Sequence, residues 1–287
     1  MTPTVKTFFD EATYTATHIV SDMEAKRCAI IDSVLDYQAS SGRTATDSAD
    51  VVLAYIKDNG LTVDWILETH AHADHFSAAP YLREKTGGKI AIGAHIPDVQ
   101  KVFGGLFNAG ERFARDGSQF DHLFEDGEVF DVGALEIKVM NTPGHTPACV
   151  SYIVGDSVFV GDTIFMPDFG SARCDFPGGD AGTLYDSVQK LFALPDDTKV
   201  YLCHDYKAPG RDEFVLETTI GAQKRDNIHM GGEVSREDFI AMREARDKTL
   251  SMPKLILPAI QVNMRAGDLP EPEDNGQIYL KIPLNAV

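Results

Sequence analysis

The sequence predicts an α/β (α+β) protein in which two mixed sheets pack face to face with helices outside them. Three observations favour this class. Strand signals come as hairpins in two batches, helical segments lie between and after the batches, and no Gly/Ser-rich linker or internal repeat divides the 287 residues. This order of elements is more typical of a layered sandwich than of one doubly wound parallel sheet. We therefore expect one main domain over 1–250 and an extended C-terminal appendage over 251–287 that packs on it.

The first batch of strands fills the N-terminal third of the chain. Two runs rich in β-branched residues flank an acidic turn at 21–26, which is typical of a hairpin. Asp47 is placed to cap a helix, and Asn59-Gly60 to end it. A short apolar run after this helix indicates a buried strand. The expected elements are, in order, strands at 13–20 and 27–33, a helix at 47–58, a strand at 63–69, a helix at 77–85 and a strand at 89–93.

Two hairpins form the second batch. Val132-Gly133-Ala134 and Gly155-Asp156 each separate two apolar runs, and the second pair is a strong two-residue turn signal. A Phe-rich insertion at 94–126 precedes them, and we expect a loop-and-helix cap there. The further expected elements are strands at 128–131, 135–140, 149–154, 157–161 and 199–203, helices at 183–193, 213–226 and 236–249, and a strand at 278–282.

Composition and charge exclude several classes of protein. Hydrophobic residues make up 43% and charged residues 24%, which is ordinary for a folded chain and excludes disorder. The net charge of −18 repels phosphate backbones and anionic lipids, so we expect no nucleic-acid or membrane partner. The four cysteines form no CxxC pair, and no apolar run reaches the roughly 18 residues of a spanning helix. We expect a soluble cytoplasmic protein.

Histidine and aspartate residues follow the ends of several predicted strands. Three histidines and one aspartate occur together in His70-Ala71-His72-Ala73-Asp74-His75, directly after the strand at 63–69. His145, Asp162 and His204 each follow a later strand. Strand ends at one edge of a sandwich can converge, and imidazole with carboxylate is a ligand set for Zn²⁺, Fe²⁺ or Mn²⁺. Because such a polar cluster is costly to bury without partners, the sequence predicts a metal site here.

These motifs resemble those of the metallo-β-lactamase superfamily, and they occur in the same order from about residue 13 to residue 226. The resemblance implies a four-layer αββα sandwich with the metal site at one edge of the two sheets. Within the superfamily the chain is most similar to the persulfide dioxygenases and to bacterial β-lactamase-like hydrolases. The segments that carry this similarity are 69–75, 142–146, 161–165, 173–176 and 204–206, with 261–267 and 273–276 near the C-terminus.

The chain departs from that pattern in two places. Related enzymes have a Gly/Cys-rich turn ending in Gly-Arg-Thr-Asp, whereas residues 169–175 here are Phe-Gly-Ser-Ala-Arg-Cys-Asp. The insertion at 94–126 is also long and rich in Phe. Both differences can reshape the substrate pocket, so the thiol that carries the persulfide stays open.

The resemblance implies one of two metal centres, and the residues alone barely separate them. In persulfide dioxygenases a single Fe(II) is held by two histidines and one carboxylate, which here are His70, His145 and Asp162. The groups that would then orient these ligands are His72, Asp74, His75 and His204. In a binuclear zinc hydrolase of the glyoxalase II type, a bridging hydroxide attacks a thioester. Its first metal would be held by His70, His72 and His145, its second by Asp74, His75 and His204, and Asp162 would bridge them.

We expect the iron enzyme, an oxidoreductase of sulfide metabolism. It would convert glutathione persulfide or a related small persulfide, with O₂ and water, into the thiol and sulfite. A protein of charge −18 needs local cations for the carboxylates of glutathione, so we expect Arg173, Tyr206 and Arg225 to bind substrate. A homodimer is expected from the resemblance. The alternative of another class is a metal-binding protein on this fold without catalytic activity.

The cysteines are expected to play smaller parts. Cys174 adjoins Arg173 and could face the site, where a nearby cation would make its thiol easier to oxidise. The remaining three, Cys28, Cys149 and Cys203, lie in predicted strands and are expected to be inert core residues.

Overall fold

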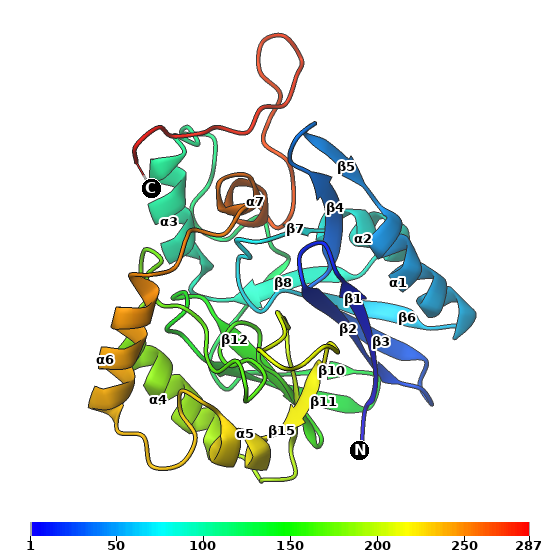
Figure 1. Cartoon of the computed structure of the whole chain (residues 1–287). Coiled ribbons are helices and arrows are strands. Elements are labelled where there is room, and N and C mark those ends of the chain that lie inside the picture. The colour runs from blue at the N-terminus through cyan, green and yellow to red at the C-terminus, as the bar shows by residue number, and fades with distance from the viewer. Residues whose placement is uncertain (1, 287) are drawn as a thin grey trace.

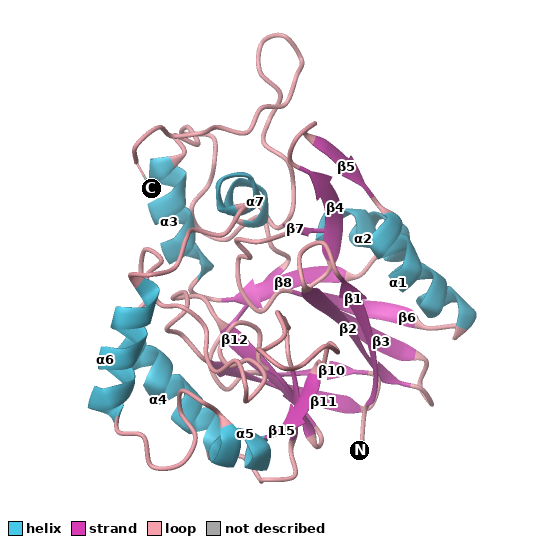
Figure 2. Ribbon diagram, in the orientation of Figure 1, coloured by secondary structure: helices cyan, strands magenta, loops and turns pink. Residues whose placement is uncertain are grey.

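Two six-stranded sheets packed against each other form the centre of the fold (Figure 1). A computed structural model describes residues 2–286, and helices cover the outer face of each sheet. The layers follow the order helix, sheet, sheet, helix, as the sequence predicts. Figure 2 shows α1 (Asp47–Asp58) and α2 (Ala79–Thr86) on one side of the strands, and on the other α4 (Ala181–Phe192), α5 (Ile220–Asp226) and α6 (Arg236–Asp247).

The first sheet combines an antiparallel and a parallel half. Its strands β1, β2 and β3 pair antiparallel, whereas β3, β6, β8 and β9 run parallel. Side chains alternate between the two faces of β3, because Cys28 and Ile30 pack with the helices while Ala29 and Ile31 contact the other sheet. The strands in spatial order are β1 (Thr4–Asp10), β2 (Thr15–Asp22), β3 (Arg27–Ile31), β6 (Thr62–Leu67), β8 (Lys89–Gly93) and β9 (His122–Phe124).

The second sheet is antiparallel except where β13 pairs parallel with β14. Two parallel neighbours need a crossover connection, and α4 forms it between β13 and β14. Its N-cap Asp180 accepts a hydrogen bond from the Thr183 N–H at 2.7 Å. The strands in spatial order are β10 (Val129–Val132), β11 (Leu135–Asn141), β12 (Val150–Val154), β13 (Ser157–Phe159), β14 (Lys199–Tyr201) and β15 (Glu217–Thr219). A small third sheet contains β5 (Arg43–Ala45), β4 (Val34–Gln38) and β7 (Phe76–Ser77).

Several predicted helices differ from those in the structure. Of the helix predicted at 213–226, only the part that forms α5 is helical, because residues 217–219 pair with β14 as the edge strand β15. Asp47 lies inside α1, and the N-cap is Thr46, which makes no side-chain cap bond. The Phe-rich insertion contains α3 (Ile96–Leu106) and β9. Among the described residues, no helix combines the length and the apolar character that crossing a bilayer requires.

The C-terminal segment is partly helical. Residues 251–287, predicted to be extended, contain α7 (Ile256–Asn263), which contacts α3 and β7. Ile256 and Ile260 of α7 belong to the same apolar cluster as the helices on the first sheet. Residues 278–282 form no strand, and Lys281 instead exchanges hydrogen bonds with the Gln261 side chain. The division of the chain at residue 250 stays a prediction.

Candidate metal centre

The structure brings together all the histidines and aspartates that the sequence singles out as ligands. They come from loops that follow β6, β11, β13 and β14. Their contacts link them into one group, in which Asp162 lies near His70, His145 and His204, while Asp74 contacts His75 and His204. The loops at the ends of neighbouring strands therefore converge as predicted.

His70, His145 and Asp162 form the first cluster. The Nε2 atoms of His70 and His145 lie 3.9 and 3.7 Å from Oδ2 of Asp162, and the three donor atoms are all within 4.8 Å of one another. These distances are too long for hydrogen bonds and leave room for a shared cation.

Hydrogen bonds on the far side of each imidazole determine which nitrogen faces Asp162. Nδ1 of His145 donates to the carbonyl of Arg173 at 2.8 Å. Thr69 Oγ1 donates to Asp32, so the bond of 3.0 Å between it and Nδ1 of His70 must be donated by the histidine. Both histidines therefore turn an Nε2 lone pair toward Asp162. Burial lowers the pKa of His70 well below its usual range, which keeps this ring neutral and able to ligate.

His72 is held in the opposite orientation by two buried carboxylates. Its Nε2 donates to Asp32 Oδ1 at 3.0 Å and lies 3.2 Å from Glu68 Oε2. Burial alone would lower the pKa of His72, but Asp32 and Glu68 outweigh it and raise the pKa well above its usual range. Asp32 also accepts hydrogen bonds from the N–H and the hydroxyl of Thr69. It therefore fixes the ring of His72 and the backbone before His70 at once.

Asp74, His75 and His204 form the second cluster, and here the donor atoms contact each other. Nε2 of His204 lies 3.0 Å from Asp74 Oδ2 and 3.3 Å from Asp162 Oδ1, while its Nδ1 donates to the carbonyl of Tyr14. Burial would lower the pKa of His204, but Asp74 and Asp162 outweigh it and raise the pKa. His204 therefore donates from Nδ1 to a carbonyl oxygen and places Nε2 at ion-pair distance from two carboxylates.

The C-terminal helix also holds the loop that carries these ligands. Asn263 of α7 donates two hydrogen bonds from Nδ2, to the carbonyls of His72 and His75, at 2.8 and 2.7 Å. Its Oδ1 accepts from the N–H of Ser77 at 2.9 Å. One buried side chain thus fixes the backbone at three positions of the loop.

Two buried atoms in the centre show that a metal ion fits these residues. His75 Nε2 and Asp162 Oδ1, like His72 Nδ1, are buried and have no hydrogen-bond partner within residues 2–286. An unpaired buried polar atom costs about 1–3 kcal/mol, and a cation bound by the carboxylate oxygen and by His75, whose pKa burial lowers, removes the cost at these two atoms. Imidazole nitrogens with a carboxylate oxygen are donors for Fe²⁺ or Zn²⁺.

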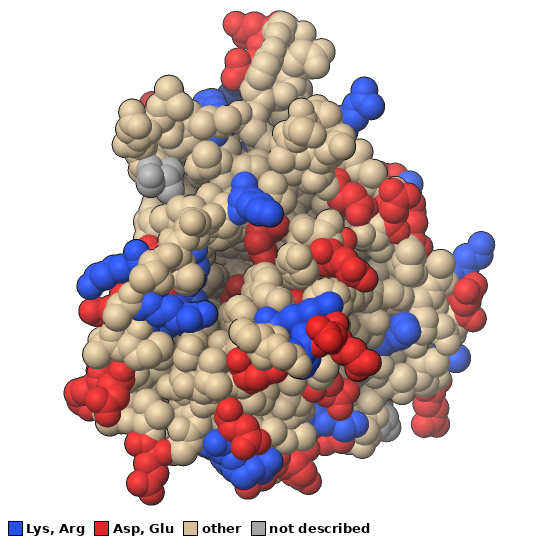
Figure 3. Space-filling model, viewed as in Figure 1, with Lys and Arg blue, Asp and Glu red and all other residues tan. Residues whose placement is uncertain are grey.

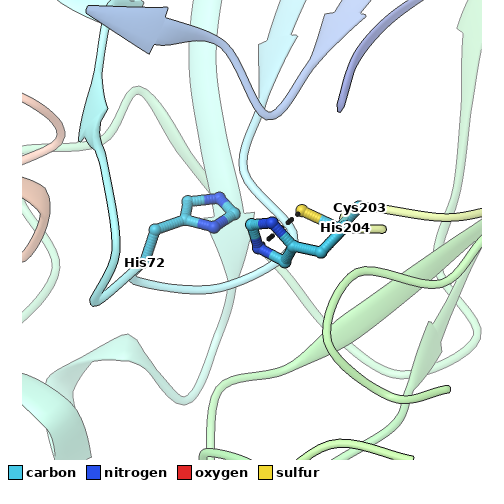
Figure 4. Close-up of side chains that lie close together, drawn as sticks. All are labelled: His72, Cys203 and His204. Atoms are coloured by element: carbon cyan, nitrogen blue, oxygen red, sulfur yellow. Dashed lines mark hydrogen bonds between the residues drawn. The ribbon is translucent and has the colours of Figure 1, made fainter. Parts of the chain in front are cut away.

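Cys203 lies closer to this centre than the sequence predicts. Its thiol is buried, and Sγ is 3.5 Å from Nε2 of His204 (Figure 4). One ligand atom each of His72, Cys203 and His204 lie within 4.8 Å of one another. The prediction of a core cysteine assumed that the strand continues to residue 203, but β14 ends at Tyr201. The regular alternation of side chains therefore does not apply to Cys203.

A cavity of about 650 Å³ opens on the metal centre, and two of the three predicted substrate-binding residues line it. Arg173 and Tyr206 are in its wall, with Asp74, His145 and Asp162. Arg225 is not in the lining and lies exposed on α5, 3.6 Å from Asp226. Cys174 is buried outside the lining, and burial raises its pKa, so the expected easily oxidised thiol is absent at this residue.

Comparisons with known proteins agree with this geometry. Residues 16–204 match the family model of the metallo-β-lactamase superfamily. A probable metallo-hydrolase of Burkholderia pseudomallei is 55% identical over 99% of this chain and 100% of its own length. The chain spans 66% of a β-lactamase hydrolase-like protein of Xylella fastidiosa, to which it is 54% identical.

Two further relatives are described as persulfide dioxygenase or ETHE1. The mitochondrial persulfide dioxygenase ETHE1 of Homo sapiens is 30% identical over 92% of this chain and 88% of its own length. The crystal structure of ETHE1 from Myxococcus xanthus covers 92% of this chain and 100% of its own, with 33% identity and a TM-score of 0.73. Because the family model matches more than half of this chain, the chain belongs to the metallo-β-lactamase superfamily.

Proposed function

We propose that this protein is a persulfide dioxygenase with one Fe(II) per chain, held by His70, His145 and Asp162. The observation that carries the proposal is the arrangement of these three donors. Two imidazole nitrogens face one carboxylate oxygen at 3.9 and 3.7 Å, and His145 and Asp162 line the open cavity. His70, His145 and Asp162 would hold the iron, and the metal would supply the redox chemistry between the persulfide sulfur and O₂ when bound.

The second cluster supports a single metal ion. Nε2 of His204 lies 3.0 Å from Asp74 Oδ2, and the raised pKa of His204 favours a proton on this nitrogen, which then has no lone pair for a second metal. The same nitrogen lies 3.3 Å from Asp162 Oδ1, at ion-pair distance, while the other oxygen of that carboxylate faces His70 and His145. His204 and Asp74 would thus act as positioning residues.

The reaction that we propose is RSSH + O₂ + H₂O → RSH + SO₃²⁻ + 2 H⁺, in which the outer sulfur is oxidised and O₂ is reduced. The relatives named as persulfide dioxygenases support this activity. Aromatic side chains of the cavity, Phe165, Phe169 and Phe176, would limit access of water to the metal. We also propose that the protein is a cytoplasmic homodimer with no nucleic-acid or membrane partner.

The second candidate is a binuclear zinc hydrolase acting on a thioester. It is favoured by the unpaired Nδ1 of His72 and Nε2 of His75, which could complete a two-metal ligand set with Asp74 and His204. The metallo-hydrolase name of the Burkholderia relative agrees with it. The candidate requires the 3.0 Å contact between Asp74 Oδ2 and His204 Nε2 to open when the second ion binds.

Metal content and O₂ uptake separate the two candidates. The protein is purified without added metal at low oxygen, and iron and zinc are measured per chain. About one iron per chain, with O₂ uptake and sulfite formation on adding glutathione persulfide, is the expected result. About two zinc ions, no O₂ uptake and hydrolysis of S-lactoylglutathione would establish the hydrolase instead.

A matched pair of variants tests the ligand assignment. His145→Gln should lose iron and O₂ uptake together. His95→Gln, at an exposed histidine paired with Asp98 on the surface, should keep both. Iron retained at the wild-type amount in His145→Gln would contradict the proposed triad.

A further inference from the structure

We infer that Asp247 of α6 is a positioning residue of the metal centre, whose charge acts on His145 through one peptide group of the loop 171–175. The inference rests on the proposed function for the assignment of His145 as a metal ligand, which the iron and the zinc candidates share. It does not depend on which of the two reactions the centre performs.

A single peptide group separates the two side chains. Its carbonyl, that of Arg173, accepts a hydrogen bond from Nδ1 of His145 at 2.8 Å. Its N–H, that of Cys174, donates to Oδ2 of Asp247 at 2.9 Å. Resonance joins the two ends of a peptide group, so a negative charge at the N–H makes the carbonyl a stronger acceptor. The carboxylate and the imidazole are therefore connected by two hydrogen bonds in series.

Arg243, one turn earlier in α6, holds the carboxylate in place. Its Nε and Nη2 donate to Oδ1 of Asp247, at 2.9 and 2.6 Å, and its Nη1 donates to the carbonyl of Ser171 at 3.1 Å. Oδ2 of Asp247 stays directed at the peptide N–H. Charged side chains cover much of the surface in Figure 3, whereas Arg243 and Asp247 are only 1% and 5% exposed. Water and salt therefore screen the charge of Asp247 little.

The other histidine of the first cluster has the same kind of support. Nδ1 of His70 donates to the hydroxyl of Thr69, and this hydroxyl donates to Oδ2 of Asp32. The other oxygen of Asp32 accepts from Nε2 of His72 at 3.0 Å. At both histidines, one neutral group separates the imidazole from a buried carboxylate whose second oxygen is held by a nitrogen donor. This repetition favours a role at the ligands over a simple tie between α6 and the loop.

The effect of Asp247 is on the strength of His145 as a ligand. A stronger acceptor at the Nδ1 proton makes Nε2 of the same ring a better electron donor. Groups that support a ligand in this way change metal affinity about 10- to 100-fold when they are mutated. Because Asp247 acts through one additional group, we expect an effect at the lower end of this range.

Two double variants separate the charge of Asp247 from mechanical support of the loop. Arg243→Met/Asp247→Asn removes both charges, and the asparagine carbonyl can still accept from the Cys174 N–H. Arg243→Met/Asp247→Leu removes this hydrogen bond as well. Neither variant buries an unpaired charge, which would be strongly destabilising.

His229→Leu is the matched control in the same loop. Nδ1 of His229 accepts from the N–H of Ser171 at 2.9 Å, and the carbonyl of that peptide group, that of Gly170, accepts from Asn227 and not from a candidate ligand. His229 is buried and is not part of the cavity lining. Loss of its hydrogen bond should lower the unfolding midpoint without changing the metal centre.

Two measurements on the zinc-loaded protein test the inference without turnover. One is the dissociation constant for zinc, from competition with a chelator. The other is the ¹H chemical shift of the His145 Nδ1 proton, identified by its absence in His145→Gln. Arg243→Met/Asp247→Asn should raise the dissociation constant severalfold and move the resonance upfield. Arg243→Met/Asp247→Leu should raise the constant about tenfold and move the resonance further, while His229→Leu changes neither.

The alternative is that Asp247 only ties α6 to the loop. Wild-type values of both measurements in Arg243→Met/Asp247→Asn would establish this alternative and overturn the inference, and so would equal changes in His229→Leu. Failure of the ligand assignment has a different signature. In that case His145→Gln would bind zinc as tightly as the wild type, while the Nδ1 resonance would still respond to the two double variants.

Discussion

Asp32 provides the most stringent test of how the metal centre is held together. Asp32→Asn keeps the shape of the side chain and removes its charge. Oδ1 accepts from the Thr69 N–H at 2.7 Å and from His72 Nε2 at 3.0 Å, while Oδ2 accepts from the Thr69 hydroxyl at 2.8 Å. In the asparagine side chain, an NH₂ group replaces one of these two oxygens, and it cannot accept a hydrogen bond. At least one hydrogen bond to a charged group is therefore lost.

The size of the effect follows from the buried position of Asp32. The residue is 2% exposed, so water cannot replace the lost bond. Losing one bond to a buried charge costs about 1.5–3 kcal/mol of folding stability. Because Asp32 fixes His72 and the backbone before His70, we also expect metal affinity to fall about 10- to 100-fold. The two effects are measured by thermal unfolding and by competition with a chromophoric chelator.

The pH dependence provides a second readout of the same variant. Burial by itself would raise the pKa of Asp32, but the charge of His72 and the bonds from Thr69 outweigh it, and the net pKa is lowered. A lowered carboxyl pKa contributes stability that is present above the unfolded-state value, about 3.9, and is lost as the pH falls below it. Asp32→Asn should remove this acid-dependent part of the unfolding free energy.

Asp22→Asn is the matched control. Asp22 is also buried, at 4% exposure, and its carboxylate accepts hydrogen bonds from backbone N–H groups of Glu24, Ala25 and Ala134, away from the metal centre. Its substitution should lower stability without changing metal affinity. Metal affinity within twofold of wild type in Asp32→Asn, or an equal loss in Asp22→Asn, would refute the reasoning.

Two further substitutions test the backbone before a ligand and a buried histidine. Gly144→Ala should lower the unfolding midpoint and the metal content, because φ is +136° and an added Cβ would lie 2.4 Å from the backbone of Leu184, next to His145. Gly105→Ala, in α3 where nothing lies within 4 Å, should leave the metal content unchanged and raise the midpoint slightly, because alanine favours a helix more than glycine does. Burial lowers the pKa of His18 to about 4, so its neutral ring contributes stability above pH ~6.5 that is lost as the pH falls toward 4, by up to about 3 kcal/mol. Urea unfolding across this range should therefore depend less on pH in His18→Gln, and an unchanged slope would contradict the assignment.

The candidate ligands of the metal centre could be singled out from the sequence because their signal is local. His70 to His75 follow a recognisable strand directly, and the same is true of His145, Asp162 and His204. The groups that orient these ligands carry no such signal. Asp32 is a single acidic residue that the sequence assigns to the end of a strand, and its role depends on contacts with Thr69 and His72 across the fold.

The errors in the predicted fold have a related cause. Glu217–Thr219 becomes a strand because β14 offers an unpaired edge, with Tyr201 opposite Glu217, and this overrides the local helical pattern. Residues 278–282 have a strand-like composition but find no partner strand within the described chain. Arg225 was assigned to the substrate because of its charge, whereas its position on α5 places it outside the cavity. Charge can be read from a sequence, but the direction of an exposed side chain depends on packing.

The two hydrogen bonds from Asn263 to the loop of His72 and His75 affect the order in which the protein matures during synthesis. Both sheets and every candidate metal ligand lie N-terminal to residue 220. A ribosome therefore releases all of the ligands well before it releases the residue that fixes their loop. The ligand loop can acquire its final shape only after α7 has emerged and docked, so we expect stable metal loading to follow, rather than accompany, the folding of the sandwich.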